Sequence, residues 1–155
     1  MRIGFGSDIH KLVAERPLVL GGITIDYQLG EQAHSDGDVV FHALMDAILG
    51  ALALGDIGLY FPDNDEKYRN INSSLLLKEV VKMMKEQNYQ INNVDISITL
   101  EKPKLRPYID AMRSNIAKLL ETDIKNVSVK AGTNEGLDAL GQGLAVKAEA
   151  IVLLK

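Results

Sequence analysis

The stretch from Ala33 to Ala53 reads Ala-His-Ser-Asp-Gly-Asp-Val-Val-Phe-His-Ala-Leu-Met-Asp-Ala-Ile-Leu-Gly-Ala-Leu-Ala, and it decides the fold. It begins as a polar segment and continues as an apolar, alanine-rich one. Two of the three histidines of the chain and three aspartates fall within it. Such a concentration of imidazole and carboxylate groups indicates a metal or phosphate site.

The apolar residues of this stretch recur at helical spacing from Ser35 onward. Asp38, His42 and Asp46 follow one another at four-residue intervals on a different face, so we predict a helix with a packing face and a chemical face. Ser35 and Asp38 also fit a capping box. Free N–H groups at the helix N-terminus, beside His34, would suit a phosphate, and both interpretations stay open.

The rest of the chain alternates between strand and helix patterns. We predict an α+β two-layer sandwich with helices on one face of the sheet, because strands with period-two alternation follow helices in the second half. The expected segments are a glycine-rich strand 2–7, a polar loop 11–16, a hairpin of 17–20 and 23–27, a loop 55–63, a helix capped by Ser73 or Ser74 and running to about 88, an antiparallel-type strand 91–101, a turn 102–107, a helix 108–120, a strand 127–131, a glycine-rich loop 132–143 and a strand 145–154. The last strand becomes apolar on both sides toward its end, which hints at self-association.

The composition fits one globular domain over residues 1–155, with 46% hydrophobic and 25% charged residues. A net charge of -4 and the lack of a basic run argue against a nucleic-acid partner. Without cysteine, a metal must be bound by His, Asp, Glu and water. No segment is typical of a signal peptide or a membrane span, so we expect a soluble cytoplasmic protein without a membrane partner.

Three residues match the ligands of a catalytic zinc ion. Asp8 and His10 project from the same side of an extended strand, and with His42 they leave one coordination position open. The alternative is that His10 is a surface residue and His42 a hydrogen-bonded core residue. Asp46 could accept a hydrogen bond from the second nitrogen of His42, or it could be an ordinary helix charge.

Two later segments are less specific. Residues 132–136 follow a strand and offer N–H groups, a hydroxyl and the Glu135 carboxylate, which suits Mg²⁺, but they also suit a simple turn. The turn 102–107 carries three basic residues, and its composition favours a solvated loop.

Ordered motifs over essentially the whole chain resemble one family, 2-C-methyl-D-erythritol 2,4-cyclodiphosphate synthase of the non-mevalonate isoprenoid pathway. The resemblance is carried by Gly4-x-Gly6-x-Asp8-x-His10, the run from Ala33 to Val39, His42-Ala43-x-x-Asp46-Ala47-x-Leu49-Gly50-Ala51, Gly55-Asp56-Ile57-Gly58, Phe61-Pro62-Asp63, Asn126-Val127 to Lys130-Ala131, and Glu135. It implies a ferredoxin-like α+β sandwich that assembles as a homotrimer with active sites between adjacent subunits.

The resemblance also implies the cofactors and the reaction. Zn²⁺ would be held by Asp8, His10 and His42, and Mg²⁺ or Mn²⁺ by Glu135 with the substrate diphosphate. The 2-phosphate of 4-diphosphocytidyl-2-C-methyl-D-erythritol 2-phosphate would attack the β-phosphorus, giving the cyclic diphosphate and CMP, so the enzyme would be a cyclising phosphorus-oxygen lyase.

By the same resemblance, His34 and Thr133 would steady the transition state, and further residues would contact the substrate. His34, Ser35 and Asp63 would contact the methylerythritol phosphate, and Asp56 and Gly58 the ribose. The turn from Leu100 to Arg106 would enclose cytosine mainly through backbone groups, which overrides its reading as a solvated loop. The complete expected substrate set is His34, Ser35, Asp56, Ile57, Gly58, Phe61, Asp63, Leu100, Lys104, Leu105, Arg106, Gly132, Thr133, Asn134 and Glu135.

The chain departs from the family pattern at four positions. Ser7 stands where phenylalanine is usual, and Gly132 where threonine is common. Ala139 and Gln142 stand where some relatives place an aromatic residue and an arginine that line a trimer channel for an isoprenoid diphosphate. The rival interpretations are a non-catalytic trimeric metal- and nucleotide-binding protein, which would bind CMP without cyclisation, and a zinc phosphohydrolase, which would release free phosphate.

Overall fold

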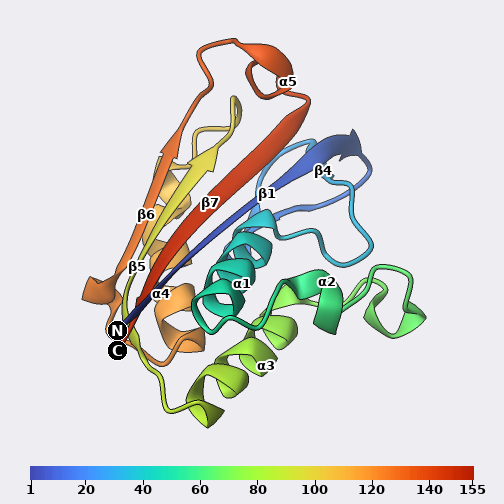
Figure 1. The fold of residues 1–155 in the computed structure, drawn as a ribbon. Coiled ribbons are helices and arrows are strands. Elements are labelled where there is room, and N and C mark those ends of the chain that lie inside the picture. The colour runs from blue at the N-terminus through green and yellow to red at the C-terminus, as the bar shows by residue number, and fades with distance from the viewer.

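The computed structural model describes residues 1–155, and its centre is a five-stranded mixed sheet (Figure 1). The strand order is β4 (Leu29–Glu31), β1 (Arg2–Ala14), β7 (Ala145–Leu154), β5 (Ile91–Thr99) and β6 (Val127–Gly132). All neighbours pair antiparallel except β5 and β6, which are parallel. The prediction of a mixed α+β fold is confirmed, whereas β5 is antiparallel only toward β7.

Three long helices pack with this sheet: α1 (Val39–Ala51), α3 (Ser73–Glu86) and α4 (Ile109–Leu119). Helix α1 contacts β1 and β7, α3 contacts α1 and α4, and α4 contacts β6 (Figure 1). The shorter elements are the hairpin β2 (Leu18–Leu20) and β3 (Ile23–Ile25), the helices α2 (Ile57–Tyr60) and α5 (Asp138–Gly141), and the 3-10 turns Glu66–Tyr68, Arg106–Tyr108 and Ile124–Asn126. The predicted long helices and hairpin are therefore present, with small differences at their ends.

The glycines of β1 bring the backbone of α1 directly against the strand. A Cβ atom on Gly6 would lie 2.0 Å from the carbonyl oxygen of Ala43, and one on Gly4 would lie 1.8 Å from that of Ala47. Asp8 and His10 come next on the same side of the strand. They therefore face the first turns of α1, where the helix carries His42.

Several local predictions differ from the structure, in one case because a distant strand pairs with the segment. Residues 11–14 belong to β1 rather than to a loop, since Leu12, Val13 and Ala14 pair with the short strand β4, which local patterning did not reveal. The predicted loops 55–63 and 132–143 contain α2 and α5. Helix α3 is capped by Asn72, with Ser73 as its first residue.

Asp38 does not lie on the chemical face of α1 as predicted. It is the N-cap, with a non-helical backbone, so the four-residue helical spacing does not extend back to it. Its fully buried carboxylate accepts hydrogen bonds from the N–H groups of Gly21, Gly22 and Phe41. Burial raises the pKa of Asp38. The main effect of the Asp38 carboxylate is to join the β2–β3 turn to α1.

The sheet face opposite α1 exposes large apolar side chains. Ile3, Phe5 and Ile9 alternate with the α1-facing residues of β1, and Ile151 of β7 pairs with Phe5. Between 46% and 72% of each of these four residues is exposed. No helix in the chain combines the length and the apolar character needed to cross a membrane.

Candidate metal centre

Asp8, His10 and His42 meet at one point between β1 and α1. Each offers one ligand atom, and the three atoms lie within 4.8 Å of one another. Asp8 Oδ2 lies 2.9 Å from His10 Nε2 and 3.2 Å from His42 Nδ1, and the two ring nitrogens are 3.3 Å apart. Two imidazole nitrogens and one carboxylate oxygen that converge in this way fit a catalytic zinc site.

The protein fixes the ring orientation of His10 from behind. His10 Nδ1 lies 2.7 Å from the carbonyl oxygen of Gly37, and a carbonyl can only accept a hydrogen bond. Nδ1 therefore carries a proton. In the neutral ring, the lone pair is then on Nε2, which faces the common point.

Two serines fix the ring orientation of His42 in a similar way. Its Nε2 lies 3.3 Å from the hydroxyl oxygens of both Ser35 and Ser73. The Ser73 hydroxyl donates to the Asp36 carboxylate, so it accepts from His42 Nε2–H. The lone pair of His42 Nδ1 is thereby directed to the same point as that of His10 Nε2.

Asp46 does not accept a hydrogen bond from His42, which is one of the two roles that its helical spacing left open. Asp46 lies one turn further along α1, and its Oδ1 accepts a hydrogen bond from the N–H of Ile57, the first residue of α2. Burial raises the pKa of Asp46. The actual partners, Ser35 and Ser73, gave no signal beyond their predicted capping roles, because Ser73 reaches His42 only through the packing of α3 against α1.

The electrostatics of the metal-free site join Asp8 and His10 as an ion pair. Burial opposes the charged forms, but the neighbouring imidazoles of His10 and His42 outweigh it and hold the pKa of Asp8 well below its usual value. In the same way, burial is outweighed by the Asp8 and Glu31 carboxylates, which raise the pKa of His10 to about 10. A zinc ion needs the neutral ring, so metal binding must displace this proton.

We expect the metal-free protein to lose stability as the pH rises from 6.5 toward 10. In that interval the folded state holds a proton on His10 that the unfolded chain has released, so the free energy of unfolding falls with pH, by at most about 1.4 kcal/mol per unit. The corresponding contribution of Asp8 is complete above pH 3.8 and is lost only in acid. Urea unfolding in a chelator at pH 6.5 and 9 measures this slope.

His10→Gln is the control for this slope, because it leaves the other titrating groups in place. Its free energy of unfolding should fall less between the two pH values than that of the wild type. Equal slopes for the two proteins would contradict the assignment.

A cavity of about 310 Å³ opens in front of the triad. Most of the site residues expected from the first half of the chain line it. They include His34, Ser35, Asp46, Ile57, Gly58, Phe61 and Asp63. Asp56 lies beside it as the N-cap of α2, where its Oδ1 accepts from the N–H of Leu59. His34 Nε2 lies 3.1 Å from the carbonyl oxygen of Asp65.

At the N-terminus of α1, two of the first N–H groups are already paired, which disfavours the open interpretation that they bind a phosphate. The N–H of Val39 donates to the Glu31 carboxylate and that of Phe41 to the Asp38 carboxylate. Val39, Val40 and Phe41 are fully buried. Side chains of the cavity and the open metal position are therefore better placed to bind a phosphate than these two N–H groups.

Six of the remaining expected residues line a second, separate cavity of about 180 Å³. Its walls come from the loop after β5 and the end of β6, and they include Leu100, Lys104, Leu105, Arg106, Gly132 and Thr133. Glu101 links the two segments, because its carboxylate accepts from the N–H of Asn134. Glu135 is exposed nearby, with its Oε1 3.4 Å from the Thr133 hydroxyl.

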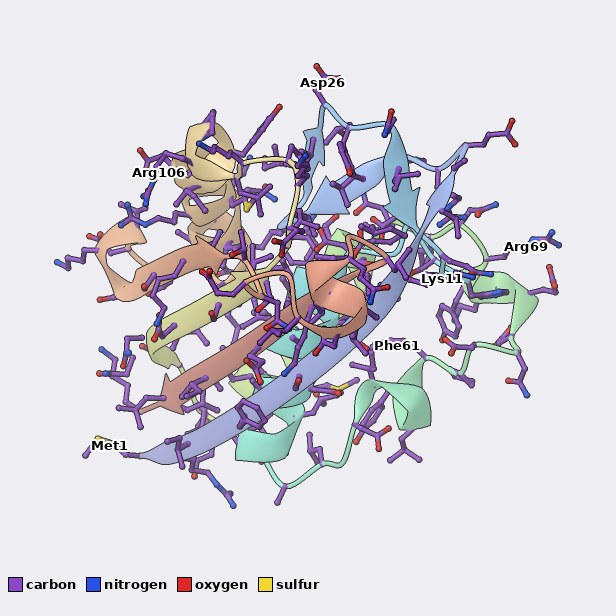
Figure 2. All side chains as sticks on the ribbon, turned by 90° about the horizontal axis from the view of Figure 1, so that it is seen from above. Met1, Lys11, Asp26, Phe61, Arg69 and Arg106 are labelled. Atoms are coloured by element: carbon purple, nitrogen blue, oxygen red, sulfur yellow. The ribbon has the colours of Figure 1, made fainter.

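The two cavities share no lining residue. Phe61, from the first cavity, and Arg106, from the second, lie on opposite sides of the molecule in Figure 2. One chain therefore presents the expected active-site residues as two separate halves.

Comparison with known proteins gives consistent matches. The model of the YgbB family matches residues 1–155. The 2-C-methyl-D-erythritol 2,4-cyclodiphosphate synthase of Brachyspira hyodysenteriae is 57% identical over 155 residues, covering 100% of this chain and 98% of the relative. A solved structure of 2C-methyl-D-erythritol-2,4-cyclodiphosphate synthase in its CDP-bound form has a TM-score of 0.92 and 39% identity, covering 99% of this chain and 100% of that one.

A second solved structure, the bifunctional IspDF from Campylobacter jejuni, has a TM-score of 0.96 and 43% identity. The match covers 99% of this chain but only 42% of the bifunctional one.

Proposed function

The chain belongs to the YgbB family, and from this membership and the Asp8–His10–His42 site we propose that it converts 4-diphosphocytidyl-2-C-methyl-D-erythritol 2-phosphate to 2-C-methyl-D-erythritol 2,4-cyclodiphosphate and CMP. The single observation that carries the proposal is the convergence of these three ligand atoms in a cavity. In the proposed reaction, an oxygen of the 2-phosphate forms a bond to the β-phosphorus. The bond from that phosphorus to the bridging oxygen breaks, and CMP leaves with the electron pair and the α-phosphate.

The proposed catalysis relies on charge and position more than on proton transfer. We infer that Asp8, His10 and His42 hold Zn²⁺, and that Glu135 holds Mg²⁺ or Mn²⁺ together with the diphosphate. The chemistry that these ions supply when bound is positive charge that offsets the repulsion between phosphate groups. Orienting the 2-phosphate against the β-phosphorus is the task of the protein residues.

The cavity in front of the triad is the proposed site of the methylerythritol phosphate. His34, Ser35 and Asp63 would contact it there, with Ile57 and Phe61 in the adjoining wall, while Asp56 and Gly58 would bind the ribose. The second cavity is the proposed cytosine site, enclosed by Leu100, Lys104, Leu105 and Arg106. Residues 132–135, from Gly132 to Glu135, would contact the phosphates. Thr133 would stabilise the transition state together with His34.

We further propose that the chain, as a single domain, assembles as a homotrimer with the active site between adjacent subunits. The division of the expected residues between two cavities supports this, because one copy would supply the metal half and its neighbour the cytosine half. The exposed apolar residues Ile3, Phe5, Ile9 and Ile151 support it as well. A patch of this kind is uncommon on a monomer and marks an interface.

Complementation between two inactive variants tests the shared site. We expect His42→Ala and Glu135→Gln each to be inactive alone, because each lacks one half of the site. When the two chains are co-expressed, every head-to-tail trimer that contains both variants should have both intact halves in one of its three sites, because the required order of neighbours occurs once in such a ring. Release of CMP by the purified mixed trimer, separated with a different tag on each variant, measures this recovery.

The mixed protein would remain as inactive as its parents if both halves of each site came from one chain. That result would contradict the shared active site without bearing on the metal ligands.

A further inference from the structure

A fourth side chain, Glu31 of β4, stands directly behind the metal ligands. It is fully buried, although glutamate is among the residues least often found inside a protein. Its Oε1 accepts a hydrogen bond of 3.0 Å from the N–H of Val39 and lies 3.5 Å from Nδ1 of His10. Its Oε2 has no hydrogen-bond partner.

No lysine or arginine offsets this buried carboxylate. His10 is its only ion-pair partner. The guanidinium of Arg16 binds the backbone carbonyl oxygens of Glu31 and Ser35 instead of the carboxylate. Burying a carboxylate without full compensation is costly, so this residue is explained poorly by folding alone.

A divalent cation at the neighbouring site would supply the missing compensation. With both imidazoles neutral, the Asp8 carboxylate offsets one of the two positive charges of the ion. A carboxylate at Glu31 offsets the second, through the imidazole of His10, which lies between them. Carboxylates behind ligating histidines both orient the ring and make it a stronger ligand.

We propose that Glu31 is a positioning residue for the metal centre: its charge lies 3.5 Å from His10 Nδ1, whose proton the Gly37 carbonyl accepts, and there it favours this orientation of the ring and balances the charge of the bound ion. The inference rests on the proposed zinc site, and it deepens that site by adding a residue that sequence reasoning passed over. Position 31 lay in the lead-in to the metal-binding stretch, and only the pairing of β4 with β1 brings it beside His10.

Glu31→Gln is the variant that tests this role. The amide oxygen can still accept from Val39, so the contact to α1 is kept while the charge is removed. We expect the dissociation constant for Zn²⁺, measured by competition with a chromophoric chelator, to rise by about tenfold to a hundredfold. We expect the visible absorption bands of the Co²⁺-substituted protein to shift, and the urea midpoint of the metal-free protein to stay the same or increase.

Asp38→Asn is the matched control. Asp38 is also a fully buried carboxylate at the N-terminus of α1, but it contacts Gly21, Gly22 and Phe41 instead of a metal ligand. This variant should lower the urea midpoint and leave the Zn²⁺ dissociation constant and the cobalt spectrum unchanged.

Two results would overturn the role of Glu31 while leaving the zinc site intact. One is a Glu31→Gln protein that binds Zn²⁺ as tightly as the wild type, and the other is an equal loss of affinity in Asp38→Asn. If the wild type itself binds no Zn²⁺ in this assay, the proposed metal centre fails, and the inference fails with it.

Discussion

His42→Ala is expected to remove zinc from the protein and to slow CMP release by at least about a hundredfold. Loss of a partner behind a ligand already costs ten- to a hundredfold in affinity or activity, and His42 is a ligand itself. The two remaining groups, Asp8 and His10, would form an ion pair without a third donor. Metal analysis of the purified variant and chromatographic measurement of CMP test this expectation.

Asp46→Asn is a suitable control for His42→Ala. Asp46 lies one turn further along the same face of α1, and its contact is with the N–H of Ile57. An asparagine can accept that hydrogen bond, so zinc should remain bound. Loss of zinc from both variants would show that the helix face as a whole, and not the His42 ligand, was disturbed.

The second large effect is expected from Gly6→Ala, which should destabilise the fold by at least ~3 kcal/mol. The added Cβ atom would lie 2.0 Å from the carbonyl oxygen of Ala43 and 2.7 Å from the backbone nitrogen of Ala47. Both are backbone atoms of the buried helix α1, so no side chain can move aside to relieve the collision. The free energy of unfolding in urea, with the soluble fraction after expression, measures the effect.

Gly132→Ala serves as the control in that experiment. No atom lies within 4 Å of a Cβ built at Gly132, and its backbone does not require glycine. It should unfold at nearly the wild-type urea concentration. A Gly6→Ala protein that also did so would contradict the close contact of α1 with β1.

Local patterns were sufficient to predict α1 and the meeting of Asp8, His10 and His42. The spacing of two residues places Asp8 and His10 on one side of a strand, and a helix with His42 on its less apolar face must pack somewhere on the sheet. Only the glycines of β1 determine where it packs. The role of Gly4 and Gly6 is a matter of packing between distant segments, so it was visible in the sequence only as part of a family motif.

The groups behind the ligands could not be predicted in the same way. Glu31 reaches His10 through the pairing of β4 with β1, and Ser73 reaches His42 through the packing of α3 on α1. Asp36 belongs to this group because its carboxylate accepts a hydrogen bond from the Ser73 hydroxyl. Each contact depends on tertiary structure, whereas the four-residue spacing of Asp46 from His42 is a local pattern, and the Asp46 carboxylate accepts from the N–H of Ile57 instead.

The division of the expected substrate residues between two cavities was also beyond local reasoning. The motifs around His34 and Asp63 and those around Arg106 and Thr133 lie on different elements that a single chain keeps apart. The family resemblance implies a homotrimer with a shared site, and this assembly stays a proposal. The separation of the halves in one subunit provides a physical reason for such an assembly.

Phosphorus NMR of the product tests the central claim most directly. The wild-type protein, supplied with Zn²⁺, Mg²⁺ and 4-diphosphocytidyl-2-C-methyl-D-erythritol 2-phosphate, should give the two coupled resonances of a cyclic diphosphate together with one equivalent of CMP. Inorganic phosphate in place of the cyclic product, or bound substrate that remains unchanged, would contradict the proposed cyclodiphosphate synthase activity.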